Sequence, residues 1–278
     1  MKKQFSNSAN AEPDQNMLVY VAMPMTMTTV ASDVMFSIAG TGKILIDWGD
    51  GIKKIYLLSA KSVYTHHYSD ASSHTITLKG GNITGLSCFN NQLTALDVSK
   101  NIALQSLYCG RNQLASLDVS KNGALTDLDC GSNLLTTVDV SKNIMLQWLT
   151  CIDNQLTTLD VSKNCALTNL WCSRNQLTAL DVSRNIALTE LFCSTNQLTS
   201  LDLTNNTALK DYGYHPYIAV YCYSNRLTGP ALNALFGTLH GNDEPKTIYI
   251  YDNPGIADCD PSIAINKGWA VDTVSTFW

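Results

Sequence analysis

The feature that most constrains this chain is an internal repeat of 21 residues that runs from Ile83 to Ala208 without a gap. Six consecutive units fill this range, and the unit Leu104–Ala124 reads LQSLYCGRNQLASLDVSKNGA. Repetition at a fixed short period is typical of solenoids, in which each unit stacks on the next. A single unit cannot bury its own apolar side, so the core must form between neighbouring units.

Within each unit, apolar residues first alternate with polar ones and then recur in a second short segment. Alternation around Leu107 and Cys109 predicts a short strand whose apolar side chains point inward. Stacking of such strands predicts a curved solenoid with a parallel β-sheet on its concave face. The LDVS segments predict mostly irregular outer coils. The predicted array covers residues 83–255, with about eight strands.

Two positions of the unit recur along the array and predict side-chain ladders. An asparagine follows each strand, where a buried amide can satisfy backbone groups that have no sheet partner. This asparagine ladder comprises Asn91, Asn112, Asn133, Asn154, Asn175, Asn196, Asn225 and Asn253. The cysteine ladder comprises Cys88, Cys109, Cys130, Cys151, Cys172, Cys193 and Cys222. We interpret the asparagines as structural.

The cysteine ladder has three interpretations. A metal site calls for clustered Cys or His ligands, which a 21-residue spacing along a sheet does not supply. A disulfide needs Cβ atoms about 3.5–4.5 Å apart, and neighbouring parallel strands hold them slightly farther apart. Free, buried thiols that pack as small hydrophobic side chains fit best. No metal or cofactor is predicted, and Cys165 lies off the ladder.

The pattern LxxLxCxxNxLxxLDVSxNxA resembles the leucine-rich-repeat signature LxxLxLxxNxL, with cysteine at the third apolar position. These units are similar to the cysteine-ladder repeats of internalin J and of related bacterial leucine-rich-repeat surface proteins. The resemblance covers roughly residues 83–255. It implies export, a location outside the cell or at the bacterial cell surface, and an adhesive or interaction role.

The residues before the array do not repeat. Residues 1–16 are polar, with two lysines but no apolar core behind them, which predicts a flexible tether rather than a signal peptide. Residues 17–82 alternate like strands between glycine-rich turns, which predicts a small antiparallel β-sandwich-like domain. IDWGDG followed by YTHHYSDASSHTITL resembles the PKD-type immunoglobulin-like domain. Its predicted role is to cap the first repeat.

Residues that could carry chemistry receive structural interpretations. The DWGDG turn lacks the ligand spacing of a calcium loop. We expect Asp47, Trp48 and Asp50 to form this turn, and His66, His67 and His74 to lie on strand surfaces. The outer-coil series Asp97, Asp118, Asp139, Asp160 and Asp181 is expected to cap turns. Because no nucleophile–base motif or phosphate-binding loop accompanies them, we predict no enzymatic activity.

The array is predicted to end in a C-terminal cap formed by residues 256–278. The segment GPALNALFGTLHG predicts a short helix, and KTIYIYDNPG restores a last strand. A second helix is expected to begin at Asp260-Pro261 and to end at Gly268. Trp269 and Trp278 are expected to cover the last coil.

Charge and hydropathy restrict the partners. The net charge is −5, the pI is about 5.4, and the sequence has no cluster of Lys and Arg. Nucleic acid and anionic membrane surfaces both require a basic face, so neither is predicted as a partner. No apolar run approaches the ~18–20 residues of a membrane helix, and no membrane insertion by this segment is predicted.

Solvent-facing strand positions differ between units, so they carry the specificity of such a protein. The C-terminal half of the concave face is aromatic, whereas its middle contains Asp127, Asp129 and Asp153. An insertion near residues 211–218 interrupts the period beside the aromatic half. Clustered exposed rings mark binding sites, the structural alternative being rings that merely pack on each other. The candidate binding residues are Trp148, Trp171, Phe192, Tyr212, Tyr214, His215, Tyr217, Tyr221, Tyr223, Tyr249 and Tyr251.

Two functions fit these residues. The first is non-catalytic recognition of a protein partner at the cell surface, through the concave face and the insertion. The alternative is glycan binding, in which the rings stack on sugars and carboxylates accept hydrogen bonds from hydroxyl groups. The rings extend across several strands, roughly 15–20 Å at the usual strand spacing, which favours a protein partner.

Overall fold

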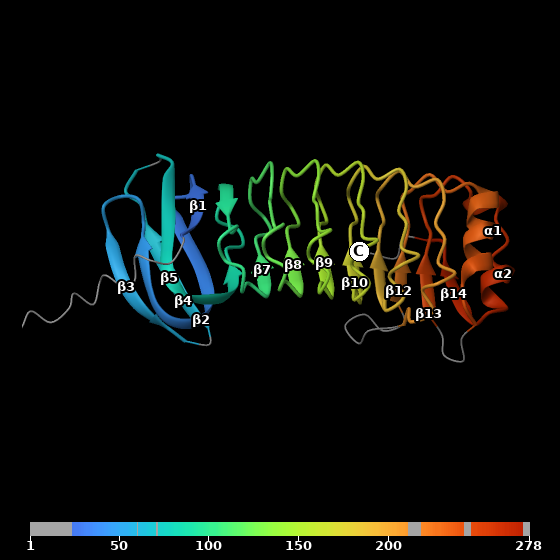
Figure 1. Ribbon diagram of the computed structural model, residues 1–278. Coiled ribbons are helices and arrows are strands. Elements are labelled where there is room, and N and C mark those ends of the chain that lie inside the picture. Colours follow the sequence, from blue (N-terminus) through green and yellow to red (C-terminus); the bar gives the residue numbers. More distant parts are fainter. Residues whose placement is uncertain (1–23, 60, 71, 211–217, 242–245, 275–278) are drawn as a thin grey trace, which may run out of the picture.

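The computed structural model describes residues 24–59, 61–70, 72–210, 218–241 and 246–274. Antiparallel strands form its N-terminal end, a row of stacked coils follows, and two helices close the C-terminal end (Figure 1). All the described strands belong to one hydrogen-bonded sheet of 14 strands. The chain is thus a solenoid built on one continuous sheet.

The N-terminal strands are β1 (Met25–Thr29), β2 (Asp33–Asp47), β3 (Lys53–Leu58), β4 (Ser62–His67) and β5 (His74–Ser87). The first half of β2 pairs with β4 and its second half with β3, both antiparallel. Its other edge pairs with β5, and β1 pairs with the first half of β5. These pairings confirm the antiparallel strands that the alternating sequence predicts.

Strand β5 joins the antiparallel and parallel parts of the sheet. Its last residues, Gly85–Ser87, pair in parallel with β7 (Ser106–Tyr108), the next strand of the solenoid. The boundary expected between residues 82 and 83 therefore falls inside one strand. Side chains from both parts belong to a single buried cluster. Among the described residues, a separate β-sandwich domain is accordingly not observed.

The parallel strands continue in register at one per coil. They are β8 (Asp127–Asp129), β9 (Trp148–Thr150), β10 (Asn169–Trp171), β11 (Glu190–Phe192), β12 (Ile218–Tyr221), β13 (Lys246–Tyr249) and β14 (Trp269–Asp272). In the coils of β5 and β7–β11 the inward leucine and the ladder cysteine are completely or almost completely buried, as the alternation predicts. Val220 and Cys222 at β12, and Ile248 and Ile250 at β13, are buried in the same positions. Strand β14 lies within the predicted C-terminal cap, where the sequence analysis did not expect a strand.

Outside the strands, the coils are mostly irregular, as predicted. One exception is β6 (Leu93–Asp97) in the first coil, which pairs antiparallel with β1. The outer aspartates cap turns: the Asp118 carboxylate accepts the backbone N–H of Ser120 at 2.8 Å, and each of the others repeats this contact. The turn-capping interpretation of this series is confirmed.

The asparagine ladder joins successive coils, as expected. Asn112 donates from Nδ2 to the carbonyls of Cys88, Cys109 and Gly110, at 2.9–3.2 Å. Its Oδ1 accepts the N–H groups of Asn91 and Leu93, each at 2.9 Å. One side chain therefore satisfies backbone groups of its own coil and of the preceding one, which have no partner in the sheet.

A second asparagine ladder, on the outer side, was missed by the sequence analysis. Asn143 donates from Nδ2 to the carbonyls of Val119 and Asn122 in the preceding coil, at 3.0 and 2.8 Å. No hydrogen-bond partner among the described residues reaches its buried Oδ1. The members of this ladder are Asn101, Asn122, Asn143, Asn164, Asn185 and Asn206.

The cysteine ladder consists of free, fully buried thiols, which agrees with the packing interpretation. Burial raises the pKa of the Cys88 and Cys222 thiols to about 12, because the thiolate loses its hydration. Cys165, off the ladder, is exposed. Thiols with such raised pKa values behave as apolar side chains at neutral pH.

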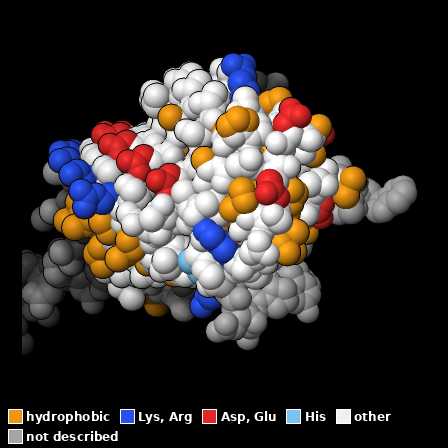
Figure 2. Space-filling model, turned by 90° about the vertical axis from the view of Figure 1, so that its right-hand side faces the viewer, with side chains coloured by type: hydrophobic (Ala, Val, Ile, Leu, Met, Phe, Trp, Pro, Cys, Tyr) orange, Lys and Arg blue, Asp and Glu red, His pale blue; other side chains and the backbone are white. Residues whose placement is uncertain are grey.

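The C-terminal end confirms both predicted helices, α1 (Gly229–Thr238) and α2 (Ser262–Ile265). Asp260 accepts the N–H of Ser262 at 3.0 Å, and Gly268 follows α2 with φ 82°. Trp269 is buried at this end, whereas Trp278 lies outside the described residues. Figure 2, which looks at this end, shows hydrophobic side chains scattered among polar ones.

One expectation for the N-terminal strands was wrong. His74 is not on the surface: it is 7% exposed, and its ring stacks on Tyr68 with centroids 3.8 Å apart. Trp48 takes part in the turn, as expected, since its N–H donates to the Ile52 carbonyl at 3.0 Å, and its ring is also buried and stacks on His66. Burial of one ring against another is a tertiary effect that strand alternation does not report.

In the DWGDG turn, the carboxylates of Asp47 and Asp50 accept the N–H groups of Gly49 and Ile52, as turn-forming residues do. His67 is exposed, as expected. His66 is only partly exposed, since it is held between the Trp48 ring and the Asp50 carboxylate.

Candidate functional site: the strand face

The outward side chains of β5 and β7–β14, and those of the second residue after each of these strands, form a surface that we call the strand face. It corresponds to the concave face expected from the sequence. Register places residues of successive coils side by side, so Tyr108, Asp129 and Thr150 form one row. The next row along the strands contains Asp127, Trp148 and Asn169, in the same order.

The aromatic candidates form a continuous chain of ring contacts. Trp148 meets Trp171 edge-on at 5.1 Å between centroids, and Trp171 stacks on Phe192 at 5.1 Å. Phe192 meets Tyr221 edge-on at 4.4 Å, and Tyr221 stacks on Tyr249 at 4.9 Å. A branch to Tyr223 leads on to Tyr251. The structure thus brings together the seven candidate rings that lie in described parts of the chain.

These rings differ in how much solvent they contact. Trp148 is 39% exposed, and Trp171, Phe192, Tyr223 and Tyr249 are half-buried. Tyr221 and Tyr251 are 8% and 6% exposed, which corrects the expectation that both face solvent. The difference has a physical cause. Alternation predicts the side of the sheet to which a ring points, whereas contacts with neighbouring rings determine how much of the ring remains exposed to solvent.

The other candidates belong to the insertion. Tyr212, Tyr214, His215 and Tyr217 lie outside the described residues, so the structure places none of them. Their contribution to the site remains a prediction from the sequence.

Polar side chains hold the exposed tryptophans in position. Trp148 Nε1 donates to Thr150 Oγ1 at 2.7 Å, within the same strand. Trp171 Nε1 donates to Glu190 Oε2 at 3.1 Å, and Asn169 donates to the same oxygen at 2.6 Å. The sequence analysis missed Glu190. Glu190 occupies the same row of outward strand positions as Asp127 and Trp148, so the repeat spacing could have identified this carboxylate.

Acidic side chains occupy the middle of the strand face, as the sequence indicated. Asp127 and Asp129 lie on β8 and are half-buried, while Asp153 is exposed in the turn after β9. Burial raises the pKa of the Asp129 carboxyl, although the hydrogen bond from the Gly131 N–H opposes the rise. An ionised Asp129 therefore lacks part of the solvation that water would give it.

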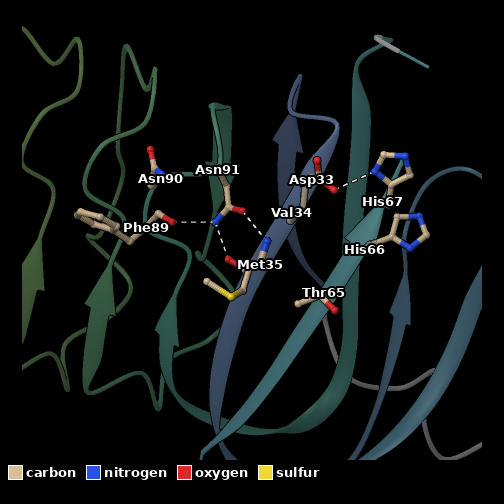
Figure 3. A pocket seen from close by; sticks show the side chains of 9 residues that line it. All are labelled: Asp33, Val34, Met35, Thr65, His66, His67, Phe89, Asn90 and Asn91. Atoms are coloured by element: carbon tan, nitrogen blue, oxygen red, sulfur yellow. Dashed lines mark hydrogen bonds and ion pairs between the residues drawn. The ribbon is translucent and has the colours of Figure 1, made fainter. Parts of the chain in front are cut away.

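A separate hollow of about 550 Å³ lies where the N-terminal strands meet the first coil. Figure 3 shows Asn91 between β2 and the first coil, with the ion pair of Asp33 and His67 on the far side from Phe89. The hydrogen bonds drawn there connect segments of the chain to one another. We therefore interpret this hollow as part of the junction.

In the part of the chain that the structure describes, no group of three or more His, Cys, Asp or Glu side chains could hold a metal ion. No helix there combines the length and the apolar character needed to cross a bilayer.

Comparison with solved structures identifies the fold. A leucine-rich-repeat protein of Leptospira interrogans is 19% identical, with a TM-score of 0.51, over 66% of this chain and 53% of that one. The chain has the leucine-rich-repeat fold. The functional domain of InlJ from Listeria monocytogenes, which includes a cysteine ladder, is 30% identical over 67% of this chain and 49% of its own, with a TM-score of 0.45.

An internalin of Listeria monocytogenes, InlF, is 17% identical over 70% of this chain and 63% of its own length, with a TM-score of 0.45. This chain therefore spans less than two thirds of each of these three structures. No protein-family model matches the chain, and no curated protein matches it.

Proposed function

We propose that this protein is a non-catalytic binding protein that recognises a protein partner through the strand face. The observation that carries the proposal is the continuous chain of ring contacts from Trp148 to Tyr249, which crosses five neighbouring strands from β9 to β13. Large aromatic side chains are the residues that contribute most to protein interfaces.

The arrangement of the rings supports binding rather than packing alone. Tyr221 and Tyr251 supply packing, because they are nearly buried. Trp148, Trp171 and Phe192 keep part of their surface in water, and hydrogen bonds fix both indole rings. Rigid, partly exposed rings lose little conformational entropy on binding, so they suit a recognition surface.

We infer that the N-terminal strands serve as the cap of the array. Strand β5 supplies the first strand of the solenoid, and β1 covers the outer segment β6 of the first coil. Edges of this kind otherwise recruit further strands. From its cysteine-bearing repeats, we propose that the protein works outside the cell, at a bacterial surface.

The proposal can be tested with the full chain immobilised on a sensor and screened against a displayed library of random peptides. The site variant is Trp171→Ala with Phe192→Ala. We expect it to weaken the binding of selected peptides by about 30-fold or more, since loss of a central aromatic residue typically costs ~2 kcal/mol or more. A matched variant, Ser87→Ala with Ser106→Ala, changes the N-terminal end of the same face and should bind as the wild type does.

Thermal unfolding of both variants separates a lost contact from a lost fold. Equal loss of binding in the two variants would place the contact outside the aromatic half. A glycan array run in parallel covers the alternative. Binding of sugars together with a failure to select peptides would replace the protein partner by a glycan.

A further inference from the structure

Acidic side chains occupy outward positions of strands β7–β14, and none of the described outward positions of these strands holds a Lys or Arg. The acidic residues are Asp127, Asp129, Glu190 and Asp272. Basic side chains lie nearer the N-terminal end: Lys79 is on β5, and Arg111 follows β7 with its guanidinium over the Phe89 ring. The ion pairs in which both partners are described all lie in the N-terminal part of the chain, between Asp33 and His74. These four carboxylates therefore form no ion pair with any described residue.

Two of the carboxylates, Asp127 and Asp129, share strand β8. Thr126 Oγ1 donates to Asp127 Oδ2 at 2.6 Å, and the Gly131 N–H donates to Asp129 Oδ1 at 2.9 Å. One oxygen of each carboxylate is thus engaged, which fixes the side chain and leaves the other oxygen available as an acceptor. A carboxylate has room for about four hydrogen bonds, so each retains capacity for a donor.

Two positions next to the Asp129 carboxylate are glycines, Gly110 and Gly131. A Cβ atom on Gly110 would lie 3.0 Å from Asp129 Oδ1 and 3.2 Å from Oδ2, and one on Gly131 would lie 3.3 Å from Oδ1. The carboxylate consequently rests over two positions that have no side chain. Burial also raises the pKa of Asp129, which means that a cation brought to it would restore solvation that the ionised group lacks.

Aromatic rings flank β8 on both sides. Tyr108 lies beside Asp129 in the register, and Trp148 lies beside Asp127. These rings are 38% and 39% exposed, more than the other rings of the strand face that belong to strands. Cations favour the face of a tyrosine or tryptophan ring, and a lysine or arginine forms its strongest hydrogen bonds with carboxylates.

We propose that the partner of the strand face is a protein segment that places a lysine or arginine side chain over β8, against Asp127 and Asp129 and between Tyr108 and Trp148. The inference rests on the proposed function and adds the charge of the partner to it. A segment that crosses the strands from β8 to the rings on β10 and β11 covers about 10–14 Å. In extended conformation this distance is about three to four residues, so an apolar residue should follow the cation at that spacing.

The test uses 12-residue random peptides displayed against the immobilised full chain, followed by affinity measurements on the selected peptides as synthetic probes. The acidic variant is Asp127→Asn with Asp129→Asn, which keeps acceptor oxygens for Thr126 and Gly131. The control is Asp118→Asn with Asp139→Asn on the outer coils, which changes the net charge by the same amount. Trp171→Ala with Phe192→Ala reports separately on the aromatic half.

We expect the wild type to select peptides with a lysine or arginine three or four residues from an apolar residue. The acidic variant should bind them at least tenfold more weakly, and the outer-coil control should bind them as the wild type does. Replacing the cation in the peptide by norleucine should reproduce the loss. Affinity should also fall as the salt concentration rises.

The outcomes separate this inference from the proposed function. Peptides that depend on Trp171 and Phe192 but carry no basic residue would leave the proposed function standing and overturn the cation site. Equal losses in the acidic variant and the outer-coil control would overturn it as well, because net charge alone would then explain the binding. Failure to select any peptide would count against both.

Discussion

The side-chain amide of Asn91 exchanges two hydrogen bonds with the backbone of Met35, each 2.8 Å long. Asn91 is the first member of the asparagine ladder, and Met35 lies on β2, 56 residues earlier in the sequence. In the other members, the amide oxygen accepts from the preceding coil. The first coil has no preceding coil, and β2 takes its place.

Asn91→Ala should therefore loosen the junction between the N-terminal strands and the solenoid. Loss of the two part-buried hydrogen bonds to Met35, at about 1–1.5 kcal/mol each, predicts a decrease of about 2–3 kcal/mol in the free energy of unfolding. Urea denaturation measures it. Gln113→Ala, an exposed side chain of the second coil, is the control and should change stability by less than about 0.5 kcal/mol. Similar losses in the two variants would mean that the junction does not depend on this amide.

Truncation of an asparagine side chain should lower the free energy of unfolding by different amounts in the two ladders. Asn133→Ala leaves the Leu114 N–H, which donates to Asn133 Oδ1 at 3.0 Å, without this acceptor. The three carbonyls that Asn133 contacts each keep another donor. Asn143→Ala orphans no backbone N–H: its two carbonyls also keep another donor, and the Oδ1 that it removes has no partner among the described residues. Since an orphaned buried donor is expensive, we expect Asn133→Ala to lower the unfolding free energy more, by about 1 kcal/mol. The reverse order in chemical denaturation would contradict this assignment.

The ladder thiols should resist alkylation in the native protein. Burial raises the pKa of the Cys109, Cys130, Cys151, Cys172 and Cys193 thiols well above the usual value and also excludes the reagent. Iodoacetamide at pH 8, followed by mass spectrometry, should label exposed Cys165 rapidly and the ladder only after unfolding. Rapid native labelling of Cys151 would show that the coils open more readily than a solenoid core should.

Acid should destabilise the protein through its outer coils. Hydrogen bonds from Ser99, Ser120 and Ser141 lower the pKa values of the aspartates two residues before them. A carboxyl with a lowered folded-state pKa stabilises the fold above its unfolded pKa of about 3.9, and this contribution disappears as the pH falls through the folded value. We therefore expect the urea midpoint to decrease between pH 5 and pH 2.

Ionisation of Asp129 should affect stability in the opposite sense to ionisation of the outer-coil aspartates. Burial raises its pKa, so its ionisation costs stability as the pH rises from the unfolded to the folded value. Asp129→Asn should consequently raise the urea midpoint at pH 7, where Asp139→Asn should lower it. Equal shifts of one sign in the two variants at pH 7 would refute this difference in environment.

The periodic part of the fold could be predicted because one pattern specifies every coil. Leu107 and Cys109 point inward for the same local reason as their counterparts 21 residues later. The asparagine ladder followed from the need to satisfy turn amides. The outer ladder through Asn143 obeys the same periodicity and could have been found, but its position in a polar segment made it look like surface coil.

Other features depend on contacts between segments and leave little local signal. Strand β14 forms because the edge of β13 is open, although WAVD lies outside the repeat pattern. Burial of His74 depends on the Tyr68 ring. For the candidate site, alternation predicted that Tyr221 and Trp171 share a face, whereas their unequal exposure arises from the neighbouring rings.

Asn225 keeps its place in the asparagine ladder even though its coil is eight residues longer than the 21-residue units. Its Nδ2 donates to the Cys193 carbonyl at 3.1 Å, the same distance as from Asn196 to the Cys172 carbonyl in a coil of standard length. The hydrogen bonds of the ladder therefore depend on how two neighbouring coils are stacked, and not on the length of chain that connects them. In such an architecture the surface can change in evolution while the core stays the same. Loops or whole coils can be gained at this end, so a protein can acquire new partners without changes to its interior.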